Sequence, residues 1–172
     1  MDGSFDALFE REVGYVHRTL LRLGVHARDV EDGVQEVFLA VHKKWGECDR
    51  SRPIRPWLFA FVHHYAANYR RLGRHRHTQG DAELVSTDSP EHAVAQAQAR
   101  ALLLRALDAL PDERRAIFVA CDIDEMPPPE VARALEIPLG TVYSRLRTAR
   151  EELAHAARRL IPPSRPPEGR GP

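Results

Sequence analysis

The chain has 172 residues with 25 basic and 25 acidic side chains, so its formal net charge is zero. This length suits one large domain or two small ones, and a hydrophobic content of 43% is enough to form buried cores. The two cysteines, Cys48 and Cys121, lie far apart in the sequence, which argues against a disulfide framework and fits a reducing compartment.

The N-terminal segment also bears on location. It carries acidic side chains where a secretion signal needs a basic segment followed by an apolar run. No stretch of the sequence is apolar for long enough to span a bilayer, so we expect no direct membrane insertion. Together with the cysteine content, these features predict a cytoplasmic protein.

The N-terminal part of the chain predicts three amphipathic helices. Residues 5–23 and 30–45 carry apolar side chains at helical spacing, and Asp29 stands where it can cap the second helix. A polar turn at 46–52 leads through two prolines into a third helix at 57–72, where aromatic residues recur every four positions. Three such helices can bury one another's apolar faces, so we expect them to form one small bundle.

The C-terminal part predicts four more helices after a polar linker at 78–90 that is rich in Gly, Ser and Pro. These helices are predicted at 91–109, 113–121, 130–135 and 141–159. Asp112 stands where it can cap the second of them, and Thr141 where it can cap the last. The tail at 161–172 contains too much Pro and Gly to order itself.

The predicted fold class is all-α, because no stretch alternates apolar and polar residues as a strand does. We expect two small helical domains, a three-helix bundle at 1–77 and a helix-turn-helix domain at 91–160. The linker at 78–90 is expected to be flexible, and the tail at 161–172 to be disordered.

Overall neutrality conceals two basic islands. Residues 50–77 contain seven arginines and no acidic side chain, and residues 137–160 contain five arginines against two glutamates. More acidic stretches flank and separate the islands. Because local potential governs binding to a polyanion, this distribution favours nucleic acid as a partner.

Helix-turn-helix spacing is found in the segment PEVARALEIPLGTVYSRLRTARE. Small Ala132 and apolar Ile137, Val142 and Leu146 fall where the two helices must pack. The last helix then presents side chains that can contact base edges or phosphates from the major groove. These are Thr141, Tyr143, Ser144, Arg145, Arg147, Thr148 and Arg150.

An ordinary helical hairpin with a solvated charged face would show much of the same pattern. One departure at the turn counts against the motif, because such motifs commonly have Gly where Glu136 stands. That position often needs a left-handed backbone, and a non-Gly residue there costs up to about 1 kcal/mol. A folded domain can absorb this cost.

The first basic island interleaves aromatic residues with arginines. Trp57, Tyr65 and Tyr69 alternate there with Arg52, Arg55, Arg70, Arg71, Arg74 and Arg76. Aromatic rings can stack on unpaired bases while arginines neutralise the backbone, which is how proteins bind single strands. The alternative is that the rings belong to a core and the arginines to a solvated surface.

Two parts of the sequence resemble bacterial sigma factors. One part resembles the second region of these factors: it consists of VEDGVQEVFLAVHKKW followed by PWLFAFVHHYAANYRR. The other part resembles their fourth region and has the sequence LDALPDERRAIFVACDIDEMPPPEVARALEIPLGTVYSRLRTAREEL. It contains LP, then the helix pair, then GTVxSRLxxAR, in the same order as the family. No long segment lies between the two parts and no extra domain precedes them, a layout that resembles the extracytoplasmic-function (ECF) group.

The resemblance implies a transcription initiation factor without enzymatic activity, which directs RNA polymerase to specific promoters and helps to melt them. The implied partners are promoter DNA, an anti-sigma factor and core polymerase, through the clamp helices of its largest subunit and the flap of its second-largest subunit. The residues implied to bind the clamp helices are Asp29, Asp32, Gln35, Glu36 and Phe38.

The resemblance also implies two sets of DNA contacts. Those for the −10 element are Cys48, in the base-capturing loop 46–52, and Trp57, His64, Asn68, Tyr69, Arg70 and Arg71. Those for the −35 element are Tyr143, Ser144, Arg147 and Thr148 at bases, with Thr141, Arg145 and Arg150 at phosphates. Cys48, His64 and Cys121 depart from the family's usual Phe, Asn and occasional Arg, which bears on base preference.

Two other classes of protein remain open on the residues alone. A helix-turn-helix regulator that never joins the polymerase would use the second basic island and have no need of the first. An interaction protein could bind polymerase without touching DNA. An enzyme is the least expected class, because no nucleophilic triad or phosphate-cradling Gly loop is found.

The nine histidines raise the question of a metal site. The only clusters are His63-His64 and His75-x-His77, and adjacent histidines on a helix point about 100° apart. No CxxC or HxxxH spacing supports them. We therefore predict neither a metal site nor a cofactor.

Overall fold

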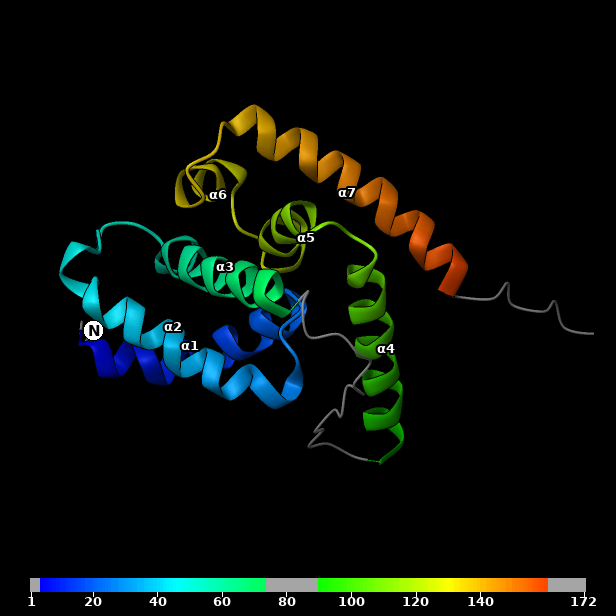
Figure 1. Cartoon of the computed structure of the whole chain (residues 1–172), viewed down its shortest axis with the longest axis horizontal. Helices are drawn as coiled ribbons and strands as arrows, with labels where there is room; N and C mark the ends of the chain where they lie inside the picture. Colours follow the sequence, from blue (N-terminus) through cyan, green and yellow to red (C-terminus); the bar gives the residue numbers. More distant parts are fainter. Residues whose placement is uncertain (1–3, 74–89, 161–172) are drawn as a thin grey trace, which may run out of the picture.

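The computed structural model describes residues 4–73 and 90–160, whose helices are labelled in Figure 1. These residues form helices and short connections without any strand, which confirms the predicted all-α class. Within the described ranges, no helix is both long and apolar enough to cross a membrane. The predicted linker, apart from Pro90, and the predicted tail lie outside the described residues.

Three helices form the N-terminal module, residues 4–73: α1 (Phe5–Arg22), α2 (Val30–Lys43) and α3 (Ile54–Gly73). Their apolar faces meet in a core that includes Leu8, Val16, Leu20, Val34, Val37, Val41, Leu58, Phe59 and Val62. The Ser4 hydroxyl caps α1 by accepting from the Ala7 amide at 3.2 Å. α3 begins three residues earlier than predicted, since Pro56 is tolerated in a first turn, where amides lack helical acceptors.

The connection between α1 and α2 fixes the angle between them. Gly24 adopts a φ of 90°, a left-handed conformation that favours glycine, and ends the first helix as predicted. Asp29 occupies the N-cap position of α2, but its side chain makes no capping hydrogen bond. Its carboxylate instead accepts a hydrogen bond from the Tyr69 hydroxyl at 2.5 Å, which ties the start of α2 to α3.

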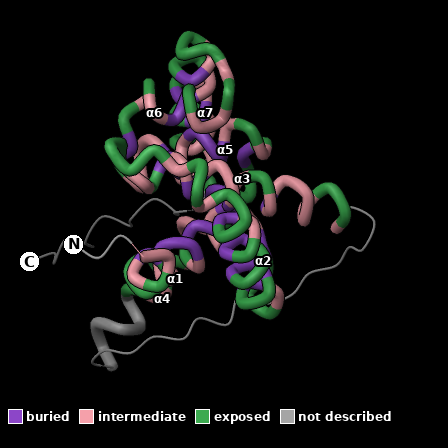
Figure 2. The backbone as a smooth tube through the Cα atoms, turned by 90° about the vertical axis from the view of Figure 1, so that its left-hand side faces the viewer, coloured by how far each residue is buried: buried purple, intermediate pink, exposed green. Residues whose placement is uncertain are grey.

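The C-terminal module, residues 90–160, contains α4 (Pro90–Asp108), α5 (Asp112–Phe118), a π-helical turn (Val119–Ile123), α6 (Pro128–Ala134) and α7 (Leu139–Leu160). Its buried apolar side chains include Leu107, Leu110, Ile117, Val119, Val131, Val142, Leu146 and Ala149. They lie where α5, α6 and α7 face one another, so the helix-turn-helix pair packs on a third helix. In Figure 2 the buried segments, in purple, lie on the sides where the helices meet.

Besides the missing capping bond at Asp29, two more predicted helix caps are wrong. Pro111 holds the N-cap position of α5, so Asp112 is already the first residue of the helix. α7 begins at Leu139, and Thr141 lies in its first turn with its amide donating to the Pro138 carbonyl at 2.9 Å. In both cases a proline at the helix start took the place that the prediction gave to a polar side chain.

The two modules pack directly against each other. Figure 1 shows α5 and α6 beside α3, and α6 contacts α3 along several residues. Arg22 of α1 pairs with Asp124 at 2.8 Å, and Arg70 of α3 pairs with Asp112 at 2.7 Å. The predicted division into two helical domains did not anticipate this contact, which joins their cores into one continuous cluster.

Candidate nucleic-acid interface

The turn between α6 and α7 has the geometry of a helix-turn-helix motif. Glu136 adopts a φ of 55°, the left-handed conformation predicted for this position. The amide of Ile137 donates to the Ala132 carbonyl at 3.0 Å, which closes the turn. Val142 is fully buried beneath it, so one face of α7 is fixed against α6 and the opposite face points outward.

The outward face of α7 carries the predicted base contacts. Tyr143 is 53% exposed, and Ser144 and Arg147 are exposed beside it. Among the described residues, Arg147 has no hydrogen-bond or ion-pair partner, so its guanidinium can bind a base edge or a phosphate. The hydroxyls of Ser144 and Thr148 donate to carbonyls one turn back, both at 3.1 Å, and their oxygens can still accept.

Two of the three predicted phosphate contacts of α7, Arg145 and Arg150, are already paired with carboxylates. Arg150 forms two hydrogen bonds with Asp122, both at 2.7 Å, which raise the pKa of its guanidinium. Arg145 binds Glu113 of α5 at 2.5 Å. Each pair fixes the orientation of an arginine side chain. A phosphate that binds there would have to share the guanidinium with the carboxylate or displace the carboxylate.

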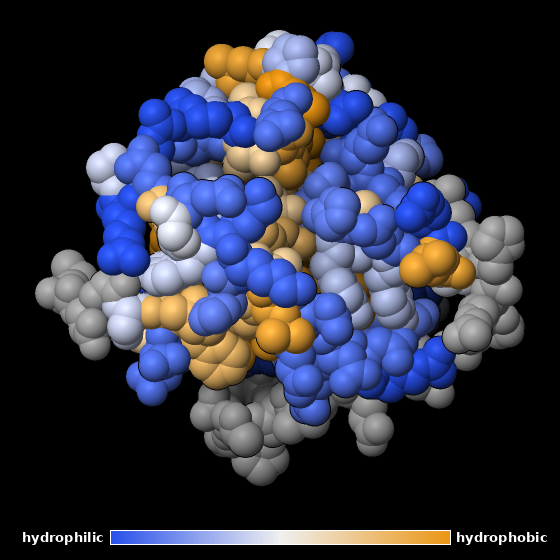
Figure 3. All heavy atoms as spheres, turned by 60° about the vertical axis from the view of Figure 1, so that its left-hand side comes forward, coloured by the Kyte–Doolittle hydropathy of each residue, from blue (hydrophilic) through white to orange (hydrophobic). Residues whose placement is uncertain are grey.

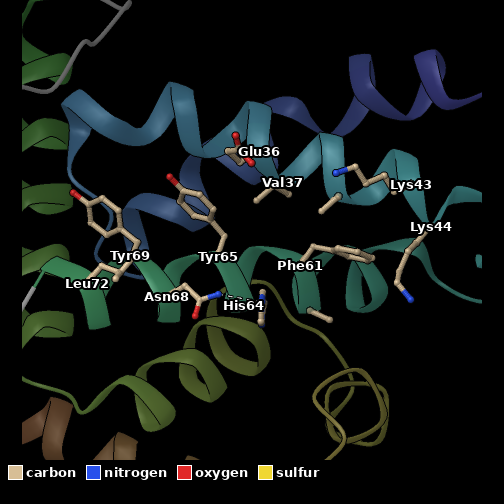
Figure 4. A pocket seen from close by; sticks show the side chains of 12 residues that line it. Glu36, Val37, Lys43, Lys44, Phe61, His64, Tyr65, Asn68, Tyr69 and Leu72 are labelled. Carbon is tan, nitrogen blue, oxygen red and sulfur yellow. Dashed lines mark hydrogen bonds between the residues drawn. The ribbon is translucent and has the colours of Figure 1, made fainter.

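Three of the predicted −10 contacts form a polar row along α3. The Asn68 amide donates to His64 Nε2 at 3.0 Å, and Arg71 donates to the Asn68 oxygen at 3.3 Å. The residues stand three or four positions apart, so they share one face of the helix. Figure 4 shows His64 and Asn68 side by side on this face, joined by their hydrogen bond.

An apolar groove of about 630 Å³ lies beside this row, between α2 and α3. Figure 4 shows Phe61, Tyr65 and Tyr69 lining it from α3, with Val37 on the α2 side. The Tyr65 and Tyr69 rings stack with their centroids 6.3 Å apart. Burial and the hydrogen bond to Asp29 raise the pKa of Tyr69 to about 12, so its hydroxyl is a donor at neutral pH.

The predicted base-capture loop follows α2 and leads into α3. Trp57 is half-buried, with its ring 4.8 Å from that of Phe61 and 6.4 Å from that of Trp45. Arg50, which the sequence did not single out, lies over the Trp45 ring at 5.0 Å. Cys48 lines a second hollow of about 360 Å³, and burial raises the pKa of its thiol.

The predicted polymerase-binding residues do not all share one surface. Asp32, Gln35 and Glu36 are exposed on α2. Phe38 is only 4% exposed, with its ring packed 4.7 Å from that of Phe9, so it supports the helix from inside. Asp29 is bonded to Tyr69 and serves the junction of α2 with α3.

Leu39 extends the exposed face of α2, and the sequence did not single it out. It is 56% exposed and follows Asp32 and Glu36 by seven and three positions, which is helical spacing. The sequence signal that could have identified it is a leucine at helical spacing from two acidic residues of the same helix. Other apolar areas, orange in Figure 3, lie among hydrophilic side chains on one face of the molecule.

The described residues contain no group of three or more His, Cys, Asp or Glu side chains that could hold a metal ion. His75 and His77 lie outside them. Cys121 is half-buried in the C-terminal module, where burial raises the pKa of its thiol to about 11. Its thiol is therefore protonated at neutral pH.

Comparison with known families accounts for both modules. The model described as "Sigma-70 region 2" matches residues 8–76, and the one described as "Sigma-70, region 4" matches residues 100–153. The chain belongs to the sigma-70 family. The first match ends three residues beyond α3, and the second includes α5, α6 and the helix-turn-helix face of α7.

Curated relatives assign this sigma factor to the ECF group. It is 32% identical over 160 residues to the ECF RNA polymerase sigma factor SigE of Mycolicibacterium smegmatis, covering 87% of this chain and 60% of that protein. It is 24% identical over 163 residues to the ECF RNA polymerase sigma-E factor of Escherichia coli, covering 87% and 85%. The chain thus spans less than two thirds of the mycobacterial relative.

Two solved structures have a similar fold. One is CnrH in complex with the cytosolic domain of CnrY, with a TM-score of 0.66 and 24% identity over 88% of this chain and 85% of that chain. The other is the sigma factor RpoE in complex with the anti-sigma factor NepR from Bartonella quintana, with a TM-score of 0.70 and 16% identity over 88% and 95%.

Proposed function

We propose that this sigma factor binds core RNA polymerase, carries it to specific promoters and helps to melt them. It would contact polymerase through the exposed face of α2, the −35 element through α7, and the −10 element through α3 and loop 46–52. The proposed working domains are 1–77 and 91–160, and the proposed location is the cytoplasm.

The observation that carries this proposal is the presence of two surfaces of different chemistry on one chain. α7 offers an exposed helix with Tyr143 and Arg147, which suits the major groove of a duplex. α3 offers aromatic rings and a row of polar side chains, which suits unpaired bases. A simple helix-turn-helix regulator has no use for the second kind of surface.

An anti-sigma factor is the further partner that we propose. RpoE, one of the similar solved structures, is in complex with an anti-sigma factor. In this chain, Leu39 and Tyr143 leave apolar surface exposed on both modules, and such surface is what a protein that covers both modules would need.

The test is whether the purified chain co-elutes with core polymerase in size-exclusion chromatography and then retains a promoter fragment that core polymerase alone does not. We expect one complex that contains all three components. Elution of the chain apart from the polymerase, with binding of DNA by the chain alone, would contradict the proposal and favour an independent regulator.

A further inference from the structure

The groove between α2 and α3 is long and apolar. Its volume of about 630 Å³ is within the range of small-molecule sites. It follows α3 from Ala60 to Leu72, a length of roughly 18 Å at ~1.5 Å of helix rise per residue. Leu72 is 67% exposed at one end, so apolar surface stays open to solvent. A long, thin apolar ligand would remove this surface from water.

The aromatic wall of the groove is fixed before any ligand binds. The Tyr65 ring lies against α2 where Gly33 has no side chain, because a Cβ at Gly33 would come within 2.8 Å of it. The Tyr69 hydroxyl is held by the Asp29 carboxylate at 2.5 Å. Binding to a wall that is already ordered costs less conformational entropy than binding to mobile side chains.

One end of the groove is basic. Figure 4 shows Lys43 and Lys44 beyond Phe61, at the end opposite Leu72. Lys44 binds Glu47 at 3.1 Å, whereas Lys43 has no ion-pair partner in the part of the chain that the structure describes. The Lys43 ammonium is therefore available to an anion. An amphiphile with a negative head group and an apolar tail is complementary to this arrangement.

The opposite half of the groove disfavours an anionic head group. Glu36 lines it beside Tyr65 (Figure 4). Burial and the negative charges of Asp29, Asp32 and Glu36 raise the pKa of Tyr65, so all three acids act on this half. Like charges repel, which directs a carboxylate to the lysine end and the tail towards the tyrosines. The two ends thus define one orientation for the ligand.

The length of the groove indicates the length of the tail. Roughly 18 Å corresponds to about 14 carbon atoms of an extended hydrocarbon chain, in which each ~1.5 Å bond is inclined to the chain axis. A saturated chain carries no polar group that the apolar wall would leave without a partner. Tetradecanoate, the anion of a free fatty acid, has both the required tail and the required head group.

We infer that this groove binds a free long-chain carboxylate, with its head group at Lys43 and its tail along Tyr65 and Tyr69, and that the bound ligand masks the surface proposed to act on unpaired bases. The masking rests on the proposed function, because Asn68 and Tyr69, two proposed −10 contacts, line the groove. The duplex-binding face of α7 belongs to the other module and stays open.

The first test is calorimetric titration of the full chain with tetradecanoate below its micellar concentration. We expect saturable binding of one ligand per chain. Affinity should fall about twofold for each methylene removed, because an open groove buries only part of each one. Tetradecyltrimethylammonium has the same tail with a cationic head group and should bind about tenfold more weakly, since it lacks the bond to the lysine. Circular dichroism checks that the helices persist with each ligand.

Two substitutions test the position of the ligand, and neither residue belongs to a proposed DNA or polymerase site. Lys43→Glu should weaken tetradecanoate binding about tenfold and remove the preference for an anion. Ala40→Phe should weaken both amphiphiles, because the larger side chain fills the groove from its half-buried side. Arg100→Glu, at an exposed position of α4, makes the same change of net charge away from the groove and should leave binding unchanged.

The second test measures masking through the affinity for random-sequence DNA, single-stranded or duplex, with and without tetradecanoate. At a ligand concentration ten times its Kd, full competition should lower single-strand affinity about tenfold. Duplex affinity should not change. In Lys43→Glu, the same ligand concentration should lower single-strand affinity much less.

The outcomes separate the two proposals. Absence of saturable binding, or wild-type affinity in both Lys43→Glu and Ala40→Phe, would overturn the site. If Ala40→Phe loses helix content, Lys43→Glu alone decides the position. Sedimentation with anionic phospholipid vesicles, without binding of monomeric tetradecanoate, would assign the groove to a lipid surface and also overturn the site.

One-to-one binding that leaves single-strand affinity unchanged would overturn the masking. A chain that binds no single-stranded DNA even without the ligand would overturn the proposed −10 contacts and leave the carboxylate site intact.

Discussion

Arg147 is the side chain of α7 best placed to distinguish one base from another. It is exposed, and it has no partner among the described residues. Arg147→Ala should therefore reduce affinity for a preferred duplex by about 1–3 kcal/mol and relax selection at one base pair. The measurement is binding to promoter fragments in which each base pair of the upstream element is varied in turn.

The matched control for this change is Arg158→Ala, which removes another exposed arginine of α7 beyond the helix-turn-helix segment. It should leave the base preference unchanged. An equal loss of affinity on every fragment in Arg147→Ala would contradict a base contact and indicate a phosphate contact.

A substitution at Glu136 tests the backbone geometry of the turn between α6 and α7. Its left-handed φ of 55° is unfavourable for a side chain with a Cβ. Glu136→Gly should raise the free energy of unfolding by up to about 1 kcal/mol, measured by urea denaturation. Arg133→Gly, within helix α6, should lower the same quantity by about 0.5–1 kcal/mol. A loss of stability in Glu136→Gly would mean that the carboxylate has a compensating role.

At the scale of elements, α2 is the helix whose exposed acids we assign to polymerase. Replacing Asp32 and Glu36 together by arginine should weaken binding to core polymerase, because charge reversal on a docking face can cost several kcal/mol. Titration of labelled chain with core polymerase measures the change. Both positions are exposed, so the fold should tolerate the substitutions.

The control reverses the charge of another exposed acidic pair, Asp6 and Glu10, which stand four apart on α1. It changes net charge equally and lies outside the assigned face. Unchanged polymerase affinity in the α2 variant, or an equal loss in both variants, would remove the assignment of α2.

Most of the helices could be predicted from the sequence, because the spacing of apolar residues along a helix is a local pattern. The first helix was predicted at 5–23 and is Phe5–Arg22. The starts of helices were less predictable, since Pro56 and Pro138 sit close to the true starts while polar residues nearby offer equally plausible caps. The π-helical turn at Val119–Ile123 has no pattern that distinguishes it from the end of an α-helix.

The candidate site was predicted to a similar degree. Glu136 was expected in a left-handed turn because of the helix-turn-helix spacing, and Arg147 was expected on an outward face because of helical periodicity. Phe38 was expected to dock on a partner because of the family resemblance, but it is buried on the apolar face of α2, where helical spacing places it. Leu39, its exposed neighbour, was not among the residues that the resemblance implied.

At the scale of the whole molecule, the contact between the modules could not be predicted. Arg22 and Asp124 are 102 positions apart, and each looks like an ordinary solvated charge in its own segment. Only the packing of α3 against α6 brings the two surfaces together. Long-range pairing of this kind follows from the assembled shape of both modules, which local patterns do not contain.

The central claim is that one chain combines a duplex-binding helix with a surface that acts on melted DNA. Run-off transcription with core polymerase tests it most directly, on genomic promoter fragments supplied either as full duplex or with a premelted bubble. Asn68→Ala and Arg147→Ala are compared with the wild-type chain, since Asn68 lies on the α3 row and Arg147 on α7.

We expect the wild-type chain to support transcription from the duplex. Asn68→Ala should reduce it, and the bubble should restore part of the loss because the cost of unpairing, a few kcal/mol, has already been met. Arg147→Ala should also reduce transcription, but the bubble should not restore it in the same way, because its defect is in duplex recognition. Normal duplex transcription with Asn68→Ala, or a bubble that restores neither variant, would contradict the claim.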